Sequence, residues 1–151
     1  MLKSYIHDFN RANERGWNLI TEKYGRMMES TAPHRYEQIK DSLPEIPEAK
    51  KEIIESIVAI QVQWMEEFAV KYPKAAGNAR SIHTREDSPF NTSYETYLRG
   101  EISTYSDETL DLYGRFIAQL SIEGKNLAEM IMNHTALLYG YKSLEELEQK
   151  L

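Results

Sequence analysis

Hydrophobic residues recur every three or four positions through most of the chain, which is the period of an amphipathic α-helix and not of a β-strand. The pattern predicts a long helix over residues 2–29, a short helix over 34–42 and a third helix that begins at Pro47 and ends at Tyr72-Pro73. Two adjacent apolar stripes give the third helix a broad hydrophobic face, so we expect it at the centre of the fold.

The hydrophobic period is lost over residues 73–91, where we expect an irregular loop. A helix over 93–105 follows, then a long helix that starts after Ser106 and stops at Gly140, and finally a short helix after Ser143. No segment alternates as a strand does. The fold class is therefore all-α, a single-domain helical bundle with about three long and two or three short helices.

The two long terminal helices share an internal similarity. Aligning them pairs Gly16 with Gly124 and Asn18 with Asn126. Because a glycine inside a helix costs roughly 1 kcal/mol relative to alanine, the matched pair indicates a close approach to the backbone. We interpret it as a close helix crossing rather than a ligand contact, with the two helices antiparallel around a pseudo-two-fold axis.

Composition narrows the class of protein. A chain of 151 residues suits one domain, residues 1–151, and the absence of cysteine excludes disulfides and thiolate metal sites. No apolar run is long enough to span a bilayer and no secretory signal is present, so we expect no membrane association and a cytoplasmic location. The net charge of −6 argues against nucleic acid as a partner.

No nucleophile elbow, phosphate-binding glycine loop or dinucleotide fingerprint occurs, so we expect no cofactor. Glu-x-x-His pairs of the di-iron kind are absent. The reversed spacing places Glu86 three residues and Asp87 four residues after His83, and these three residues are the weak candidates for a metal site. We expect no metal, because such spacings arise by chance in an acidic chain.

The segment from Gly77 to Glu101 concentrates arginine, histidine, acidic residues and tyrosine. Its cations precede a helix start at which Thr92 and Glu95 form a predicted capping box and free backbone N–H groups favour negative charge. We therefore predict an anion-binding loop, with ordinary surface ion pairs as the alternative interpretation. The predicted ligand-binding residues are Asn78, Arg80, His83, Arg85, Thr92, Ser93, Tyr94 and Arg99.

Ten tyrosines against four phenylalanines form a marked excess. Tyr94 and Tyr97 lie next to the loop, where they would either line a polar cleft or pack half-buried along helix seams. Both are weak catalytic candidates together with His83, which would act as an acid or base while arginines hold an anionic substrate.

Three stretches, "NLITEKYGRMMESTAP", "IQVQWMEEFAVKYPKAAGNARSIH" and "TSYETYLRGEISTYS", resemble the bacterial family of unknown function DUF4125 from about residue 12 to the end of the chain. The resemblance implies relatives without assigned chemistry, and no catalytic residue is carried over. It also implies an additional upstream segment in the family, with a Gly-Arg pair and a cysteine. A site shared with that segment would be incomplete here, reduced to binding, or completed by a second chain.

Three hypotheses follow. The first is a binding module that takes an anionic small molecule or a protein partner through the loop and the start of the next helix, residues 78–95. The second is a small enzyme in which His83 acts with Arg80, Arg85 and Arg99. The third is a self-association module, with a homodimer as the simplest assembly. It is favoured if Trp64, Met65 and Phe68 are exposed.

Overall fold

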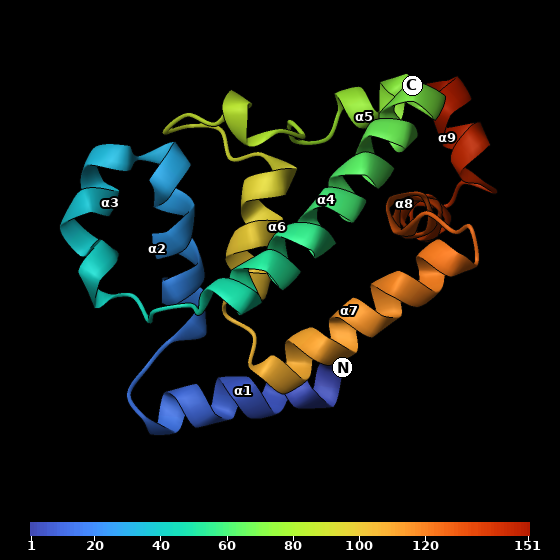
Figure 1. The fold of residues 1–151 in the computed structure, drawn as a ribbon. Helices are drawn as coiled ribbons and strands as arrows, with labels where there is room; N and C mark the ends of the chain where they lie inside the picture. Colours follow the sequence, from blue (N-terminus) through green and yellow to red (C-terminus); the bar gives the residue numbers. More distant parts are fainter.

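The computed structural model describes all residues, 1–151, which form nine α-helices and two short 3₁₀ helices without a β-strand (Figure 1). This confirms the predicted all-α class. The helices are α1 (Leu2–Glu14), α2 (Leu19–Thr31), α3 (Pro33–Ile39), α4 (Glu48–Lys71), α5 (Pro73–Gly77), α6 (Tyr94–Ser103), α7 (Asp107–Ile122), α8 (Leu127–Leu138) and α9 (Leu144–Lys150), and the 3₁₀ helices are η1 (Lys40–Ser42) and η2 (Thr84–Glu86).

The long helix α4 lies at the centre and packs against α5, α6, α7 and α8, as its broad apolar face predicts (Figure 1). Trp64, Met65 and Phe68 on α4 are buried in a single hydrophobic cluster. Helix α6 contributes Ile102 to the same cluster, and α7 contributes Ile117. The exposure of the three α4 side chains that would favour a self-association module is therefore not observed.

The predicted first helix is two helices, because the chain turns at Gly16. This residue has φ +73°, a left-handed conformation that ends α1 at little steric cost for glycine. Asn18 then caps α2, since its side-chain oxygen accepts hydrogen bonds from the backbone N–H of Ile20 at 2.9 Å and of Thr21 at 3.1 Å.

The predicted last long helix is also divided, into α7 and α8, by the same device. Gly124 has φ +69°, and Asn126 accepts from the N–H of Glu129 at 3.1 Å while donating to the carbonyl of Trp64 at 2.9 Å. A Cβ added at either Gly16 or Gly124 would meet nothing within 4 Å. The predicted close crossing at the glycines is therefore wrong. The similarity marks a repeated helix–turn–helix junction, and α2 packs on α3 and α6 whereas α8 packs on α4 and α9.

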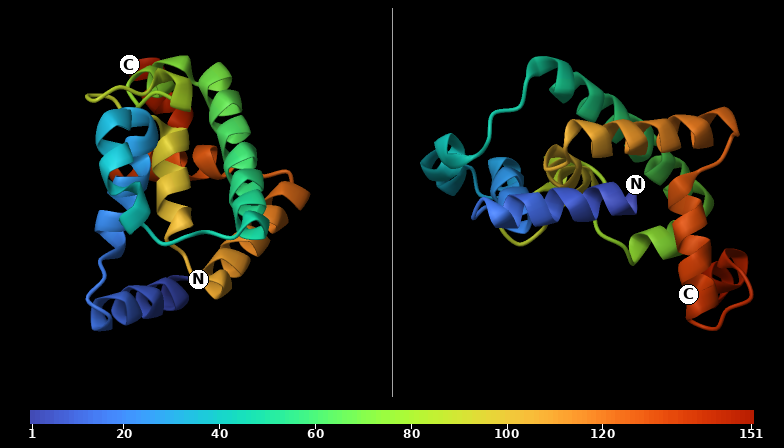
Figure 2. Two further views of the ribbon diagram at one scale, coloured as in Figure 1. Left: turned by 60° about the vertical axis from the view of Figure 1, so that its left-hand side comes forward. Right: turned by 90° about the horizontal axis from the view of Figure 1, so that it is seen from below.

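Helices α2 and α3 form an antiparallel pair beside α6 (Figure 2). The close approach of helices lies here, at Gly100 on α6, where an added Cβ would lie 2.8 Å from Cγ of Met27 and 3.2 Å from the carbonyl oxygen of Lys23. Glycine at this position therefore lets α2 lie directly on α6.

Helix α1 crosses the start of α7 and has no buried residue. It is held by polar contacts, with the hydroxyls of Ser4 and Thr109 2.6 Å apart and the carboxylate of Asp8 accepting from the N–H of Ser106 at 2.9 Å. The ring of Tyr5 adds an edge contact to a buried tyrosine of the α6–α7 turn. None of the helices is long and apolar enough to cross a bilayer.

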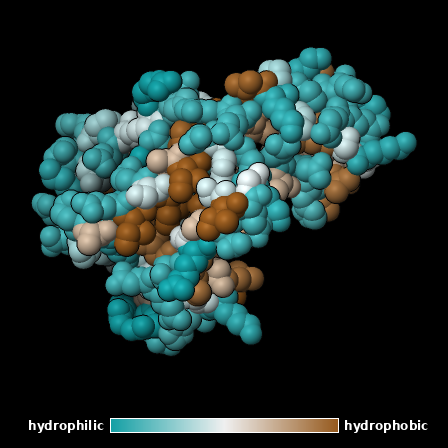
Figure 3. All heavy atoms as spheres, turned by 45° about the vertical axis from the view of Figure 1, so that its right-hand side comes forward, coloured by the Kyte–Doolittle hydropathy of each residue, from teal (hydrophilic) through white to brown (hydrophobic).

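Hydrophobic side chains gather on the face formed by α4 and α7 (Figure 3). Ile53 on α4 and Phe116 on α7 are about half exposed, at 51% and 46%. Leu112 lies one turn before Phe116 and is 39% exposed. Other exposed hydrophobic side chains lie outside this face, among them Phe90 in the loop and Leu138 at the end of α8.

Candidate functional site

The carboxylate of Asp87, and not a ligand, occupies the start of α6. The N–H of Ser93 donates to Asp87 Oδ1 at 2.7 Å, and the N–H of Tyr94 donates to the carbonyl of Ser81 at 2.7 Å. The N-cap is Ser93, whose Oγ accepts from the N–H of Thr96, so the predicted cap at Thr92 is wrong by one residue. The backbone donors expected to receive a ligand are thus already used by the loop.

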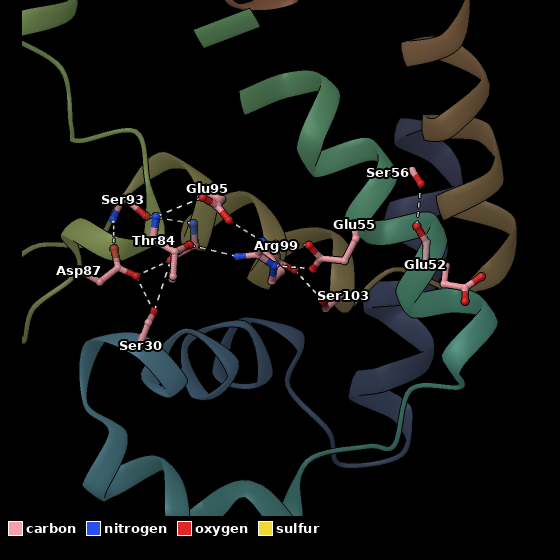
Figure 4. Close-up of polar contacts among 11 residues, drawn as sticks. Ser30, Glu52, Glu55, Ser56, Thr84, Asp87, Ser93, Glu95, Arg99 and Ser103 are labelled. Atoms are coloured by element: carbon pink, nitrogen blue, oxygen red, sulfur yellow. Dashed lines mark hydrogen bonds and ion pairs between the residues drawn. The ribbon is translucent and has the colours of Figure 1, made fainter. Parts of the chain in front are cut away.

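The second oxygen of Asp87 fastens the loop to two helices. The hydroxyls of Ser30 on α2 and Thr96 on α6 both donate to Asp87 Oδ2 (Figure 4). Burial alone would raise the pKa of this carboxyl, but the hydrogen bonds from Ser30, Thr96 and Ser93 hold it below its ordinary value. The ionised carboxylate of Asp87 therefore links α2, the loop and α6 through hydrogen bonds.

Arg99 lies next to this Asp87 cluster, and its side chain joins α6 to α4. Its Nε and Nη2 donate to the two carboxylate oxygens of Glu55 at 2.6 and 3.0 Å, Nη2 also donates to Glu95 at 2.6 Å, and Nη1 donates to the hydroxyl of Thr84 at 3.2 Å (Figure 4). The two carboxylates are not equivalent. The Glu95 side chain is 22% exposed, whereas that of Glu55 is 54% exposed.

Glu95 is fixed from two directions. Burial opposes its ionisation, yet hydrogen bonds from Arg99 and from the backbone N–H of Thr84 keep its pKa below the ordinary value. Burial opposes the charge on Arg99, but its hydrogen bonds to Glu55 and Glu95 raise its pKa, so the guanidinium is permanently charged. Glu95 is thus the structural partner of Arg99, and Glu55 is a partner that solvent reaches.

A polar cleft of about 920 Å³ opens over Arg99, within the range of small-molecule sites. It lies between α2, α3, the start of α4 and α6. Its lining residues are Arg26, Glu29, Ser30, Tyr36, Lys40, Asp41, Leu43, Pro44, Glu45, Ile46, Lys51, Ile54, Glu55, Thr84, Glu95, Thr96, Arg99, Gly100 and Ser103. One wall is the extended strap from Leu43 to Pro47, whose Pro44 carbonyl accepts a 2.6 Å hydrogen bond from Arg26.

The cleft contains Arg99 from the predicted ligand-binding set, but not the remaining cations of the loop. Arg80 donates to the carbonyl of Thr92 at 3.3 Å and its guanidinium lies 4.6 Å from the ring centre of Tyr97. Asn78 donates to a carbonyl of α5, and Arg85 is exposed without a polar contact. The structure therefore separates Arg99 from the cations with which the sequence grouped it.

The three catalytic candidates do not meet in one cavity. His83 Nε2 lies 2.6 Å from a carboxylate oxygen of Glu66 on α4, whereas the hydroxyl of Tyr94 donates to Gln61 at 3.2 Å and that of Tyr97 accepts from Lys23 at 2.9 Å. None of the three lines the Arg99 cleft.

The weak metal candidates are also divided. Glu86 accepts from the backbone N–H of His83 at 3.1 Å, and its carboxylate lies 4.0 Å from the Nδ1 of that residue, whereas Asp87 is bound to the start of α6. No group of three histidine or acidic side chains is placed to hold a metal ion.

Several tyrosines lie in helix seams rather than around a cleft. Gln61 on α4 is buried, and its amide bonds the hydroxyls of Tyr94 and Tyr113. Burial raises the pKa of Tyr94 to about 12. Tyr105 stacks edge-on with Tyr113. Part of the tyrosine excess is therefore explained by tyrosines that pack along helix seams, and not by tyrosines that line a polar cleft.

No sequence pattern marks Ser30 or Glu55 as parts of the site. Ser30 is 57 positions from Asp87, and Glu55 is 44 positions from Arg99. Neither occurs in a motif, and both contacts depend on how α2 and α4 pack around α6. Only the contact Arg99–Glu95, at i and i+4 on one helix, could be read from spacing.

Fold and site together define an all-helical protein with a polar cleft lined by charged and hydroxyl groups. Within that class, the chain belongs to the family described as protein of unknown function (DUF4125), whose model matches residues 1–149. The match confirms the resemblance and extends it to α1, upstream of residue 12. No curated protein and no solved structure gives a significant match.

Proposed function

We propose that the protein is a binding module for a polar small molecule with an anionic group, and that the ligand occupies the Arg99 cleft. The observation that carries the proposal is the unequal pairing of Arg99. Glu95 is largely shielded, but Glu55 is half exposed at the cleft and can be replaced on the guanidinium by a carboxylate or phosphate of the ligand.

The chemical groups that line the cleft support binding rather than covalent chemistry. Its polar groups are hydroxyls, carboxylates and cations, and it contains no histidine. An arginine in a partly buried hollow, aligned by Thr84 and Glu95, is a preorganised anion receptor.

The test removes the competing carboxylate. Glu55→Gln leaves Arg99 paired with Glu95 and should raise the affinity for an anionic ligand about fivefold, since a half-exposed ion pair contributes up to ~1 kcal/mol. A panel of carboxylate and phosphate metabolites would be screened by thermal shift. A ligand at a hundredfold its Kd should raise the Tm by roughly 5 to 10 °C.

The matched control is Glu52→Gln, which removes the same charge from the same helix. Glu52 makes no ion pair, and Figure 4 shows its carboxylate directed away from Arg99. Equal effects of the two substitutions, or a panel in which no compound stabilises Glu55→Gln more than the wild type, would count against the proposal.

A protein partner at the loop is the second candidate, because Phe90 at the loop tip is 100% exposed. A photo-crosslinking amino acid at position 90, introduced in the native host, should trap one specific protein. The same group at Val70, which is 84% exposed on α4, is the control. A common set of cross-links at both positions would reject a loop-specific partner.

A further inference from the structure

A second cleft, of about 380 Å³, lies on the other side of the strap from the Arg99 cleft. It opens between the end of α1, the turn into α2, the start of α4 and the α6–α7 turn. Five residues line both clefts: Arg26, Pro44, Glu45, Ile46 and Ser103. Arg11, Arg15, Trp17 and Lys50 line only the second cleft.

Two of its carboxylates are already committed. Glu22, which is buried, accepts from the indole N–H of Trp17 at 3.0 Å and from Arg26 at 2.8 Å. Asp8 accepts from the N–H of Ser106 at the start of α7. Glu45 is the remaining acid on the wall, and it makes no ion pair.

Two of the four cations that line the same cleft are uncommitted, whereas Arg26 is paired with Glu22. Arg11 and Arg15, one turn apart on α1 and just after it, form neither a hydrogen bond nor an ion pair through their side chains. Lys50 is only 19% exposed, and its ammonium is bonded to the carbonyl of Tyr105 at 2.7 Å. Its carboxylate partner is Asp107, which is 93% exposed and therefore screened by water.

The position of the two arginines has an ordinary explanation in part. Basic side chains near the C-terminal end of a helix interact favourably with the helix dipole, which accounts for a cation at the end of α1. The dipole does not account for Lys50, which comes from α4 to the same hollow. The cleft is lined by four cations and three carboxylates, of which two arginines and Glu45 have neither an ion pair nor a side-chain hydrogen bond, and this slight excess of positive charge is an exception in a chain of net charge −6.

We propose that this second cleft binds a small molecule with a phosphate group. The guanidinium groups of Arg11 and Arg15 would hold the phosphate oxygens, which offer more acceptors than a carboxylate, and Lys50 would add charge from the opposite wall. Trp17 and Ile46 give the organic part an apolar surface. The proposal is independent of the ligand proposed for the Arg99 cleft.

Inorganic phosphate is the probe, and Trp17 supplies the signal. The chain has two tryptophans, of which Trp64 is buried in the core, so a saturable change of fluorescence on titration at constant ionic strength would report the wall of this cleft. Replacing both arginines, Arg11→Gln with Arg15→Gln, should weaken phosphate binding at least about tenfold and lower the Tm by about 4 °C at most, because both side chains are exposed and lose only their interaction with the helix dipole. Each single replacement should weaken it less.

Arg35→Gln is the matched control, since Arg35 is exposed on α3, forms no ion pair and lines neither cleft. It should bind phosphate as the wild type does. The proposal is overturned by the absence of saturable binding, by equal binding in the double variant, or by equal weakening in Arg35→Gln. Binding that is lost in Arg99→Gln and kept in the double variant would place the phosphate in the other cleft and also overturn it.

Discussion

At the scale of single residues, Asp87 joins three parts of the chain with one carboxylate. It accepts from Ser30, from Thr96 and from the N–H of Ser93. Asp87→Asn removes the charge and leaves at least one of these donors poorly paired, so we expect a loss of about 1 to 3 kcal/mol in the free energy of unfolding. Urea denaturation measures it. Asp111→Asn, which breaks an exposed pair with Arg115, is the control and should change stability by less than about 0.5 kcal/mol.

The same substitution has a pH signature. The pKa of Asp87 is lower in the folded protein than in the unfolded chain, so its contribution is complete above the unfolded value of about 4 and is lost as the pH falls through the folded value. The difference in Tm between wild type and Asp87→Asn should therefore be constant from pH 7 to about 5 and narrow below pH 4. A difference that widens in acid would contradict this account.

Residue types were predictable at this scale, and their partners were not. Asp87 and Arg99 lie in the polar segment that the sequence singles out, because a helix start and clustered charges leave a local pattern. The identity of the anion at the helix start was missed, since a loop carboxylate satisfies backbone N–H groups as well as a ligand does. Glu55 left no pattern at all, because its contact with Arg99 exists only after α4 has packed against α6.

At the scale of helices, the close approach of α2 and α6 depends on Gly100. Gly100→Ala would place a Cβ 2.8 Å from the side chain of Met27 and 3.2 Å from a backbone carbonyl, so we expect a loss of about 1 to 3 kcal/mol despite the better helix propensity of alanine. Gly114→Ala is the matched control on α7, where the added Cβ meets only Ile57 at 3.5 Å. It should be neutral or stabilising by up to about 1 kcal/mol. Chemical denaturation of both variants makes the comparison.

The two asparagine caps provide an internal comparison. Asn18 bonds only the first turn of α2, whereas Asn126 caps α8 and also donates to the carbonyl of Trp64 on α4. Asn18→Ala should lower stability by about 1 kcal/mol, and Asn126→Ala by roughly 1 kcal/mol more. Equal losses, measured by thermal and urea unfolding, would show that the bond to α4 contributes nothing.

Helix existence followed from the hydrophobic period, but helix length did not. The hydrophobic period continues across Gly16 and Gly124, so the pattern shows no break at either helix junction. A glycine inside a helical pattern suggests a close approach of the backbone, but a glycine followed two residues later by asparagine is also a helix stop and a new N-cap. Local turn chemistry could therefore have found the breaks. The real contact at Gly100 depends on the partner helix and has no such local signal.

At the scale of the whole molecule, the core is unevenly distributed. Helix α4 carries seven buried residues, whereas α1 carries none and is held mainly by two hydrogen bonds and one tyrosine contact. We expect amide hydrogen exchange to be fastest in α1 and slowest in the middle of α4. Exchange followed by mass spectrometry gives the order directly. Protection of α1 equal to that of α4 would show that α1 unfolds only with the entire bundle.

The strap from Leu43 to Pro47 has a consequence for the molecule as a whole. It separates the two clefts, and Arg26, which holds it through the carbonyl of Pro44, faces both. A guest that displaces the strap on one side reshapes the wall of the other. Free-energy coupling between two such compartments is reciprocal, so whatever the first guest does to the affinity of the second, the second does to the first. The guanidinium of Arg26 and the five residues of the strap would then couple the binding free energies of two clefts that hold different ligands.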